Sequence, residues 1–121
     1  MDTIYYLFND YIRNIIKRAK EKSGVEFVGL RIREFDREKL GLENGQFKDF
    51  KQKGLLVYFG DNSRGQDEFE NAWKNRVAYA PKSLEGISIE RFEEEIAKQM
   101  KERIRQEFKG NEELEMFADG L

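Results

Sequence analysis

The chain contains no histidine and no cysteine among its 121 residues, and this limits the chemistry that it can perform. Without cysteine, disulfides, thiolate nucleophiles and zinc ribbons are excluded. Without histidine, the chain lacks the usual general base, the commonest metal ligand and the side chain that titrates near neutral pH. The simplest remaining catalysis would use carboxylates with a hard cation such as Mg²⁺ and a lysine to stabilise developing charge.

One short segment has the composition that this chemistry requires. Asp49-Phe50-Lys51 places a carboxylate two residues before a lysine, as expected for a metal-dependent nuclease. Further oxygen ligands are available at Glu26, Glu34 and Asp36. The pair should lie within a strand at the edge of a cleft, but here a glycine separates it from the following apolar run. A nuclease is therefore the least favoured alternative, and we expect no catalytic residue, no metal and no cofactor.

Residues 3–22 form the longest segment with an unbroken helical pattern. At roughly 100° per residue, its apolar side chains cover one broad arc, which is typical of a helix packed on a core. The helix is predicted to begin at Asp2 or Thr3 and to stop at Gly24. The far side carries positive charge beside an exposed aromatic, at Tyr6, Arg13, Lys17 and Lys20. Cations near a helix carboxyl end are favoured by the helix dipole, which accounts for most of this basic side.

Residues 36–54 have no clear period and contain a turn signal at Asn44-Gly45. Phe47 and Phe50 are predicted to pin this segment to the core. Loops held on a rigid scaffold often carry binding function, so the segment is a second candidate surface. Its outward lysines are predicted to be Lys48, Lys51 and Lys53.

Two strands are predicted on either side of this segment. From Val25 to Phe35 the period changes to two, with Val28, Leu30 and Ile32 on one face, so we expect a strand with one side toward a core. The run from Gly54 to Gly60 is apolar throughout and bounded by glycines. This pattern indicates a central strand covered on both faces.

The next 20 or so residues allow two interpretations. Asp67 and Glu70 have the spacing of a capping box, which favours a short helix before a third strand from Arg76 to Ala80. Residues 68–80 also fit a hairpin that turns at Lys74-Asn75. We favour the helix followed by the strand, which Pro81 ends.

A second long helix is predicted over residues 89–109, with Ser88 as N-cap and Gly110 beyond its end. The tail, residues 111–121, has four acids and several large apolar side chains. It is expected to be frayed or to form a short turn docked on the body. An acidic tail of this kind is also what a protein-docking peptide looks like. The predicted domain organisation is a single domain over residues 1–110 followed by this tail.

Together these elements predict an α+β domain, in which a small, mainly antiparallel sheet of three or four strands packs with two long helices in the order α-β-β-(α)-β-α. Double-stranded RNA-binding domains share a helix, three strands and a helix in this order, and they contact phosphates through lysines that open their second helix. Here that position is Glu93-Glu94-Glu95, which would repel a phosphate backbone. The sequence therefore indicates no membership of that family.

The leading functional hypothesis is a non-enzymatic protein-interaction or assembly module. The apolar excess at the start of the first helix is larger than one sheet face requires, so we expect a protein partner or self-association into a homo-oligomer through this helix. The predicted partner-binding residues are Tyr5, Tyr6, Phe8, Arg13, Lys17, Lys20, Lys48 and Lys51.

Two alternatives remain open besides the nuclease. A nucleic-acid-binding protein would use the basic side of the first helix together with the 48–53 loop, although the net charge of −2 disfavours it. A small inhibitor of a larger enzyme would have the same sequence features as an interaction module. No apolar run is long enough for a membrane span and no secretory signal is recognisable, so a cytoplasmic location without a membrane partner is expected.

Overall fold

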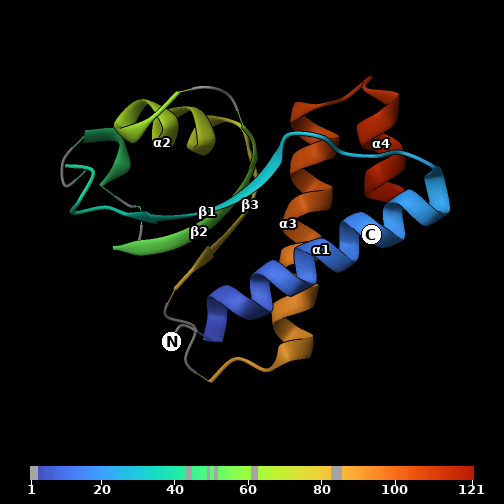
Figure 1. Cartoon of the computed structure of the whole chain (residues 1–121), viewed down its shortest axis with the longest axis horizontal. Helices are drawn as coiled ribbons and strands as arrows, with labels where there is room; N and C mark the ends of the chain where they lie inside the picture. Colours follow the sequence, from blue (N-terminus) through green and yellow to red (C-terminus); the bar gives the residue numbers. More distant parts are fainter. Residues whose placement is uncertain (1–2, 43–44, 49, 51, 61–62, 83–85) are drawn as a thin grey trace.

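The computed structural model describes residues 3–42, 45–48, 50, 52–60, 63–82 and 86–121. Over these residues the chain forms an α+β fold with a three-stranded antiparallel sheet in the order β1-β2-β3, which confirms the predicted fold class (Figure 1). The elements are α1 (Thr3–Ser23), β1 (Leu30–Asp36), the 3₁₀ helix η1 (Gly45–Phe47), β2 (Lys53–Phe59), α2 (Gly65–Lys74), β3 (Arg76–Pro81), α3 (Ile89–Glu107) and α4 (Glu112–Asp119).

Each face of the sheet has its own hydrophobic core. Successive side chains of β2 alternate between the faces, so Leu55 and Val57 enter a larger core while Leu56 and Tyr58 enter a smaller one. The larger core is completed by α1, α3 and α4, and the smaller one by α2 and the 37–52 segment (Figure 1). The prediction of a central strand covered on both faces is therefore confirmed.

The apolar arc of α1 packs into the larger core as predicted. Its fully buried residues are Phe8, Ile12, Ile15 and Ala19. The ring of Phe8 meets that of Phe92 in α3 edge to face, with centroids 5.9 Å apart. One turn further, the Tyr11 hydroxyl donates a 2.8 Å hydrogen bond to the backbone oxygen of Glu93. The start of α3 thus packs against Phe8 and Tyr11 of α1.

The smaller core is built around the ring of Phe69 in α2. This ring lies within about 5 Å of the rings of Phe35, Phe47 and Phe50, all in edge-to-face geometry. The predicted role of Phe47 and Phe50 as anchors of the 36–54 segment is confirmed, since both are buried. The segment is held by its aromatic side chains and needs little regular secondary structure.

The prediction that the first strand begins at Val25 is wrong, because β1 begins at Leu30. Gly29 has a φ of 94°, a left-handed conformation that interrupts the extended chain. Before this break the side chains no longer follow the alternation of the strand. Phe27 packs against Phe59 and Phe117, whereas Val28, predicted to face the core, is 89% exposed.

The region between the second and third strands is a helix, α2, and the hairpin alternative is excluded. The predicted N-cap of this helix is wrong by three residues. Asp67 lies inside the first turn, and the N-cap is Arg64, whose side chain makes no capping hydrogen bond. Gly65 opens the helix with a φ of 65°, so the chain reverses direction through glycine and not through a side-chain cap.

The second long helix, α3, begins after Ser88 as predicted, but it ends at Glu107, two residues before the predicted end at residue 109. The Ser88 hydroxyl accepts a hydrogen bond from the Arg91 N–H, as expected of an N-cap.

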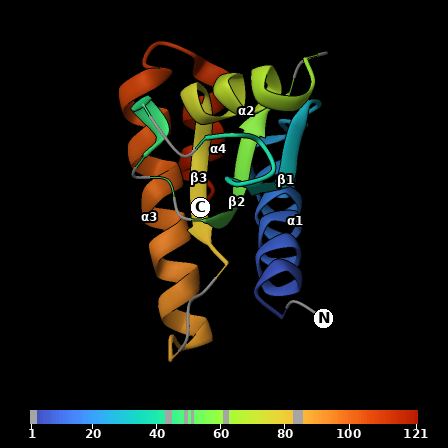
Figure 2. The same cartoon turned by 90° about the vertical axis from the view of Figure 1, so that its left-hand side faces the viewer.

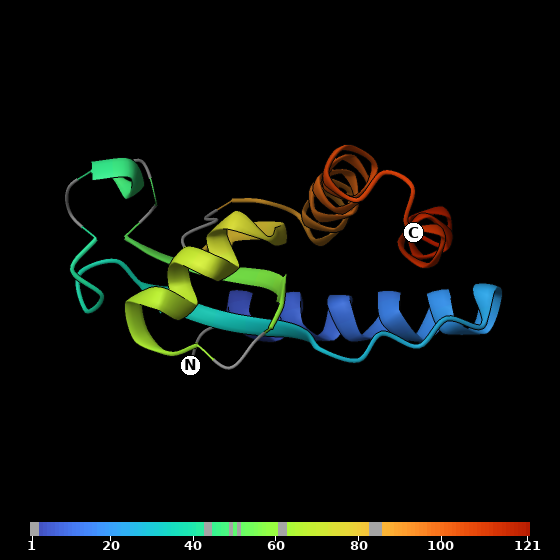
Figure 3. The same cartoon turned by 90° about the horizontal axis from the view of Figure 1, so that it is seen from above.

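The tail forms α4, whose Leu114, Phe117 and Ala118 are buried against α1 and α3. Seen from above, α1 extends beyond the sheet toward α4 (Figure 3). A Cβ at Gly120 would lie 3.2 Å from the Cα of Ala19, which is closer than most Cβ contacts, so glycine suits this close approach of α4 to α1.

Candidate functional site

The aromatic residues predicted as partner-binding on α1 do not form one surface. Phe8 is completely buried, which removes it from the predicted surface and places it in the core with Phe92. Tyr6 lies on the outer side of α1 and is 50% exposed. Tyr5 belongs to the first turns of the same helix. Of the apolar residues that suggested self-association, Phe8 is therefore internal and Tyr6 stays at the surface.

The predicted basic side of α1 is at the surface. Arg13, Lys17 and Lys20 are exposed, and Lys20 forms a 3.1 Å ion pair with Glu26. The second predicted surface lies far from these cations. Lys48 follows η1 at the opposite end of the molecule's long axis from the carboxyl end of α1, so the two basic regions do not form one surface (Figure 1).

Only some of the residues considered for a nuclease site lie in the part of the chain that the structure describes. Asp49 and Lys51 lie outside the described residues, so neither the Asp-x-Lys pair nor the predicted role of Lys51 is placed. Of the other carboxylates, Glu26 pairs with Lys20 and Glu34 with Lys82. Within the described part of the chain, no group of three or more acidic side chains is arranged to hold a metal ion. No helix in that part is long and apolar enough to cross a membrane.

The outer border of β1 carries backbone groups without partners. Two hydrogen bonds flank the β1–β2 ladder, from Gly60 N–H to Gly29 oxygen and from Arg37 N–H to Gln52 oxygen. Since residues alternate in an antiparallel ladder, odd-numbered residues of β1 point their backbone groups toward β2 and even-numbered ones point away. Three even-numbered residues of β1 have outward backbone groups with no hydrogen-bond partner among the described residues: Leu30, Ile32 and Glu34. We call these three residues the β1 edge.

The opposite border of the sheet is covered. Figure 2 shows α3 beside β3, with β1 at the far side of the sheet. Gln99 of α3 accepts a 3.1 Å hydrogen bond from the outward N–H of Tyr79. Arg103 donates to the backbone oxygens of Arg76 and Lys74, at 3.0 and 2.6 Å. Side chains of α3 therefore bond to the outward N–H of Tyr79 and the oxygen of Arg76, and they occupy this border of the sheet.

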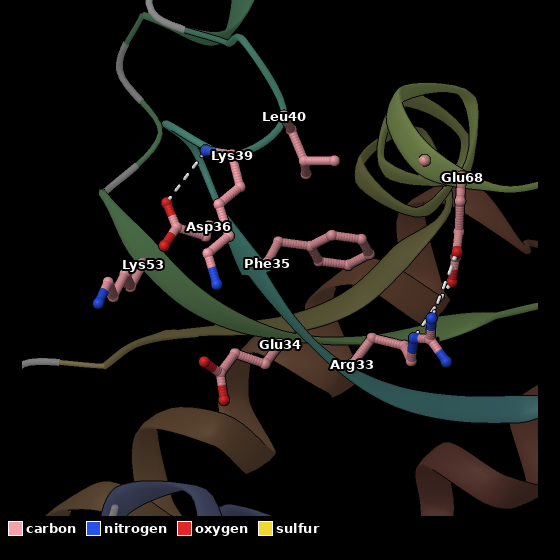
Figure 4. A pocket seen from close by; sticks show the side chains of 9 residues that line it. Arg33, Glu34, Phe35, Asp36, Lys39, Leu40, Lys53 and Glu68 are labelled. Atoms are coloured by element: carbon pink, nitrogen blue, oxygen red, sulfur yellow. Dashed lines mark hydrogen bonds and ion pairs between the residues drawn. The ribbon is translucent and has the colours of Figure 1, made fainter.

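A pocket of about 340 Å³ opens beside the β1 edge, on the face of the sheet that carries α2 (Figure 4). Phe35 and Leu40 form its apolar middle, and charged side chains stand at its two ends. We call it the β1 pocket, and its lining is residues 33–36, Lys39, Leu40, Lys53, Gly65 and Glu68. An extended segment placed along the β1 edge would direct alternate side chains toward this pocket.

One end of the β1 pocket is an internal polar network. Glu68 of α2 receives a 3.2 Å ion pair from Arg33 and a 2.7 Å hydrogen bond from the Tyr58 hydroxyl. Burial, followed by the hydrogen bond to Glu68, raises the pKa of Tyr58 well above its ordinary value of 10.0. The phenol is therefore neutral and donates to Oε1 of Glu68, which also lies 3.2 Å from Arg33 Nε, while Oε2 accepts from Arg33 Nη2 at 3.4 Å.

The other carboxylates of the β1 pocket are also engaged within the protein. The Asp36 carboxylate accepts from the N–H groups of Glu38 and Lys39, at 3.0 and 3.4 Å, and so caps the turn after β1. Glu34 pairs with Lys82 on the other side of the sheet. Of the cations on β1 and in the β1 pocket, three make no ion pair with any described residue: Arg31, Lys39 and Lys53. The unbalanced charge along the β1 edge is therefore positive.

Sequence reasoning did not identify this site, although one signal for it was present. Arg31 and Arg33 alternate with apolar residues in a predicted strand, a pattern that charged border strands use to avoid aggregation. Which border of the sheet stays open depends on the position of α3, which no local pattern contains. Comparison of the chain with protein-family models, curated proteins and solved structures gave no significant match. The argument for function therefore rests on the site.

Proposed function

We propose that the chain is a non-enzymatic protein-interaction module that binds an extended segment of a partner protein along the β1 edge. The main support is the free backbone of Leu30, Ile32 and Glu34, next to a pocket, in a sheet whose other border is covered by α3. In such strand addition, main-chain hydrogen bonds supply affinity and side-chain pockets supply specificity. The bound segment would become a fourth strand.

A second copy of the chain is a poor occupant of the same edge. When two β1 strands pair antiparallel about a twofold axis, opposed side chains share a face of the sheet. Odd positions therefore oppose odd positions, and even positions oppose even positions. The three most central registers place Arg31 opposite Arg33, Arg33 opposite itself, or Glu34 opposite itself. Like charges directly opposite one another destabilise a strand pair. The charge pattern of β1 therefore disfavours self-pairing and favours a different chain.

The proposal can be tested with peptides selected for binding from a random displayed library, using the intact protein as bait. In Glu34→Pro the outward N–H is lost and the proline ring stands in the path of an added strand. Glu34→Ala removes the same carboxylate and keeps the N–H, so it is the matched control. We expect selected peptides to bind Glu34→Ala normally and Glu34→Pro about tenfold more weakly or worse, measured by fluorescence anisotropy.

Chemical shifts locate the peptide independently. Amides of β1 should move when a selected peptide is titrated into the ¹⁵N-labelled protein, and those of α3 beside β3 should not. Peptides that bind both variants equally, or that shift a different surface, would contradict the proposed function. A library that yields no binding peptide would do the same.

A further inference from the structure

We infer that the segment bound at the β1 edge is acidic, with one apolar residue placed between carboxylates. This inference rests on the proposed function and adds the chemistry of the ligand. Its basis is the arrangement of the β1 pocket, in which an apolar middle of Phe35 and Leu40 separates charged groups at the two ends (Figure 4). Each part of that arrangement meets a different residue of an added strand.

The apolar middle of the β1 pocket selects one large aliphatic or aromatic side chain. Phe35 is 5% exposed and closes the bottom of the pocket against the ring of Phe69. Leu40, from the turn after β1, is half-buried at the same place. The volume, about 340 Å³, is within the range of small ligand pockets. A side chain that points into it would bury apolar surface on both residues.

The charges at the ends of the pocket select carboxylates. Glu34, Asp36 and Glu68 already accept ion pairs or hydrogen bonds within the protein, so they offer little to a bound cation. Arg31 is exposed without an ion pair, and Lys39 and Lys53 stand together at the end of the pocket away from Arg33 (Figure 4). A segment with carboxylates near both ends would neutralise these cations.

The strand geometry fixes the spacing of the ligand. Arg31 and Phe35 lie on the same face of β1, four residues apart, which is roughly 13 Å along a strand. The residues of an added strand that share this face are two apart. A carboxylate opposite Arg31 therefore lies four residues from the apolar side chain opposite Phe35, and the next same-face position, two residues further, reaches toward Lys39 and Lys53. The spacing holds for either direction of the added strand.

A synthetic peptide with this spacing tests the inference. Its core is Glu-Thr-Ser-Thr-Leu-Thr-Glu for a parallel strand and the reversed Glu-Thr-Leu-Thr-Ser-Thr-Glu for an antiparallel one, each capped at both ends and labelled with fluorescein through a glycine linker. One control replaces both glutamates by lysine, and a second moves the leucine by one position so that it points to the opposite face. We expect binding to the protein by anisotropy, weakened about tenfold or more in each control and by added salt.

Charge exchange on the protein completes the test. In the double variant Arg31→Glu, Lys39→Glu the preference should reverse, so that the lysine peptide binds better than the glutamate peptide. The far-ultraviolet circular dichroism of this variant shows whether it folds, and Lys17→Glu, Lys20→Glu on α1 is the control for net charge. That control should keep the preference for the acidic peptide.

The outcomes separate this inference from the proposed function. If library peptides distinguish Glu34→Pro from Glu34→Ala but are neutral or basic, the edge binds proteins and the acidic ligand is wrong. If the acidic peptide binds Glu34→Pro as well as Glu34→Ala, its binding is not strand addition and both proposals fail. Equal binding of the glutamate and lysine peptides also overturns the inference.

Discussion

The alternation of the β1 backbone predicts opposite effects of proline at two neighbouring positions. At Arg33 the N–H points toward β2, opposite Leu56, and at Glu34 it points outward. Proline at 33 would therefore remove a ladder hydrogen bond and direct its ring at β2. Proline at 34 removes only an N–H that faces away from the sheet, which is the position that border strands tolerate.

The expected energies follow from the contacts of each residue. Arg33→Pro leaves the carbonyl of the fully buried Leu56 without its donor, which costs about 1–3 kcal/mol, and the clash of the ring raises the total to about 3 kcal/mol or more. Glu34→Pro loses the ion pair with Lys82, a half-exposed contact worth at most about 1 kcal/mol. Its backbone cost is about as large as the loss of that ion pair, because no ladder hydrogen bond is broken. Once each proline is compared with the alanine variant at its own position, which removes the side-chain loss, the difference between the two prolines should be about 2 kcal/mol.

Urea unfolding followed by circular dichroism measures this difference. The variants Arg33→Ala and Glu34→Ala give the side-chain contribution, so that each proline is compared with its own alanine. With a slope near 1.5 kcal/mol per molar urea, a difference of about 2 kcal/mol moves the midpoint by more than 1 M. If the two prolines destabilise the protein equally, or if Glu34→Pro is the worse, the assigned alternation of β1 is wrong and the β1 edge is not free.

Three further outcomes follow from the cores and the polar network. Phe69→Ala should cost about 3–5 kcal/mol in urea unfolding, because its fully buried ring contacts Phe35, Phe47 and Phe50. Arg103→Ala uncovers the β3 border and should increase aggregation measured by light scattering, while Arg105→Ala, exposed on the same helix, should not. Since the pKa of Tyr58 is raised in the folded state, its contribution to stability is complete below pH 10 and is lost as the pH rises above 10. The urea midpoint should therefore fall more steeply above pH 10 than in Tyr58→Phe.

The parts of the fold that sequence reasoning predicted correctly are those with a local signal. Ser88 before a helical stripe marked the start of α3, and the apolar run between Gly54 and Gly60 marked β2. In both cases one element contains its whole pattern, either a cap or an uninterrupted apolar segment. The aromatic anchors Phe47 and Phe50 were also predictable, because large apolar side chains in a polar loop are most stable when they are buried in the core.

The errors arose where a single glycine changes the backbone. Alternation continues through Val28, but the left-handed Gly29 turns the chain before β1 and leaves that valine exposed. At α2, the left-handed Gly65 opens the helix two residues before Asp67, which was predicted to cap it. Phe8 was assigned to a partner-binding surface because the sequence does not reveal that Phe92 of α3 lies against it. The candidate site could not be predicted for a similar reason, since an open border is a property of the assembled sheet and not of one strand.

The two borders of this sheet avoid aggregation by different means, and the difference supports a binding role for β1. At β3, Gln99 and Arg103 of α3 bond to the outward N–H of Tyr79 and the oxygen of Arg76, so no strand can add there without displacing α3. At β1 the protection is charge: the alternating Arg31 and Arg33 oppose an identical strand while the backbone groups stay exposed. Charge of one sign excludes like strands but attracts acidic ones, so it selects among partners where a covering helix would exclude them all.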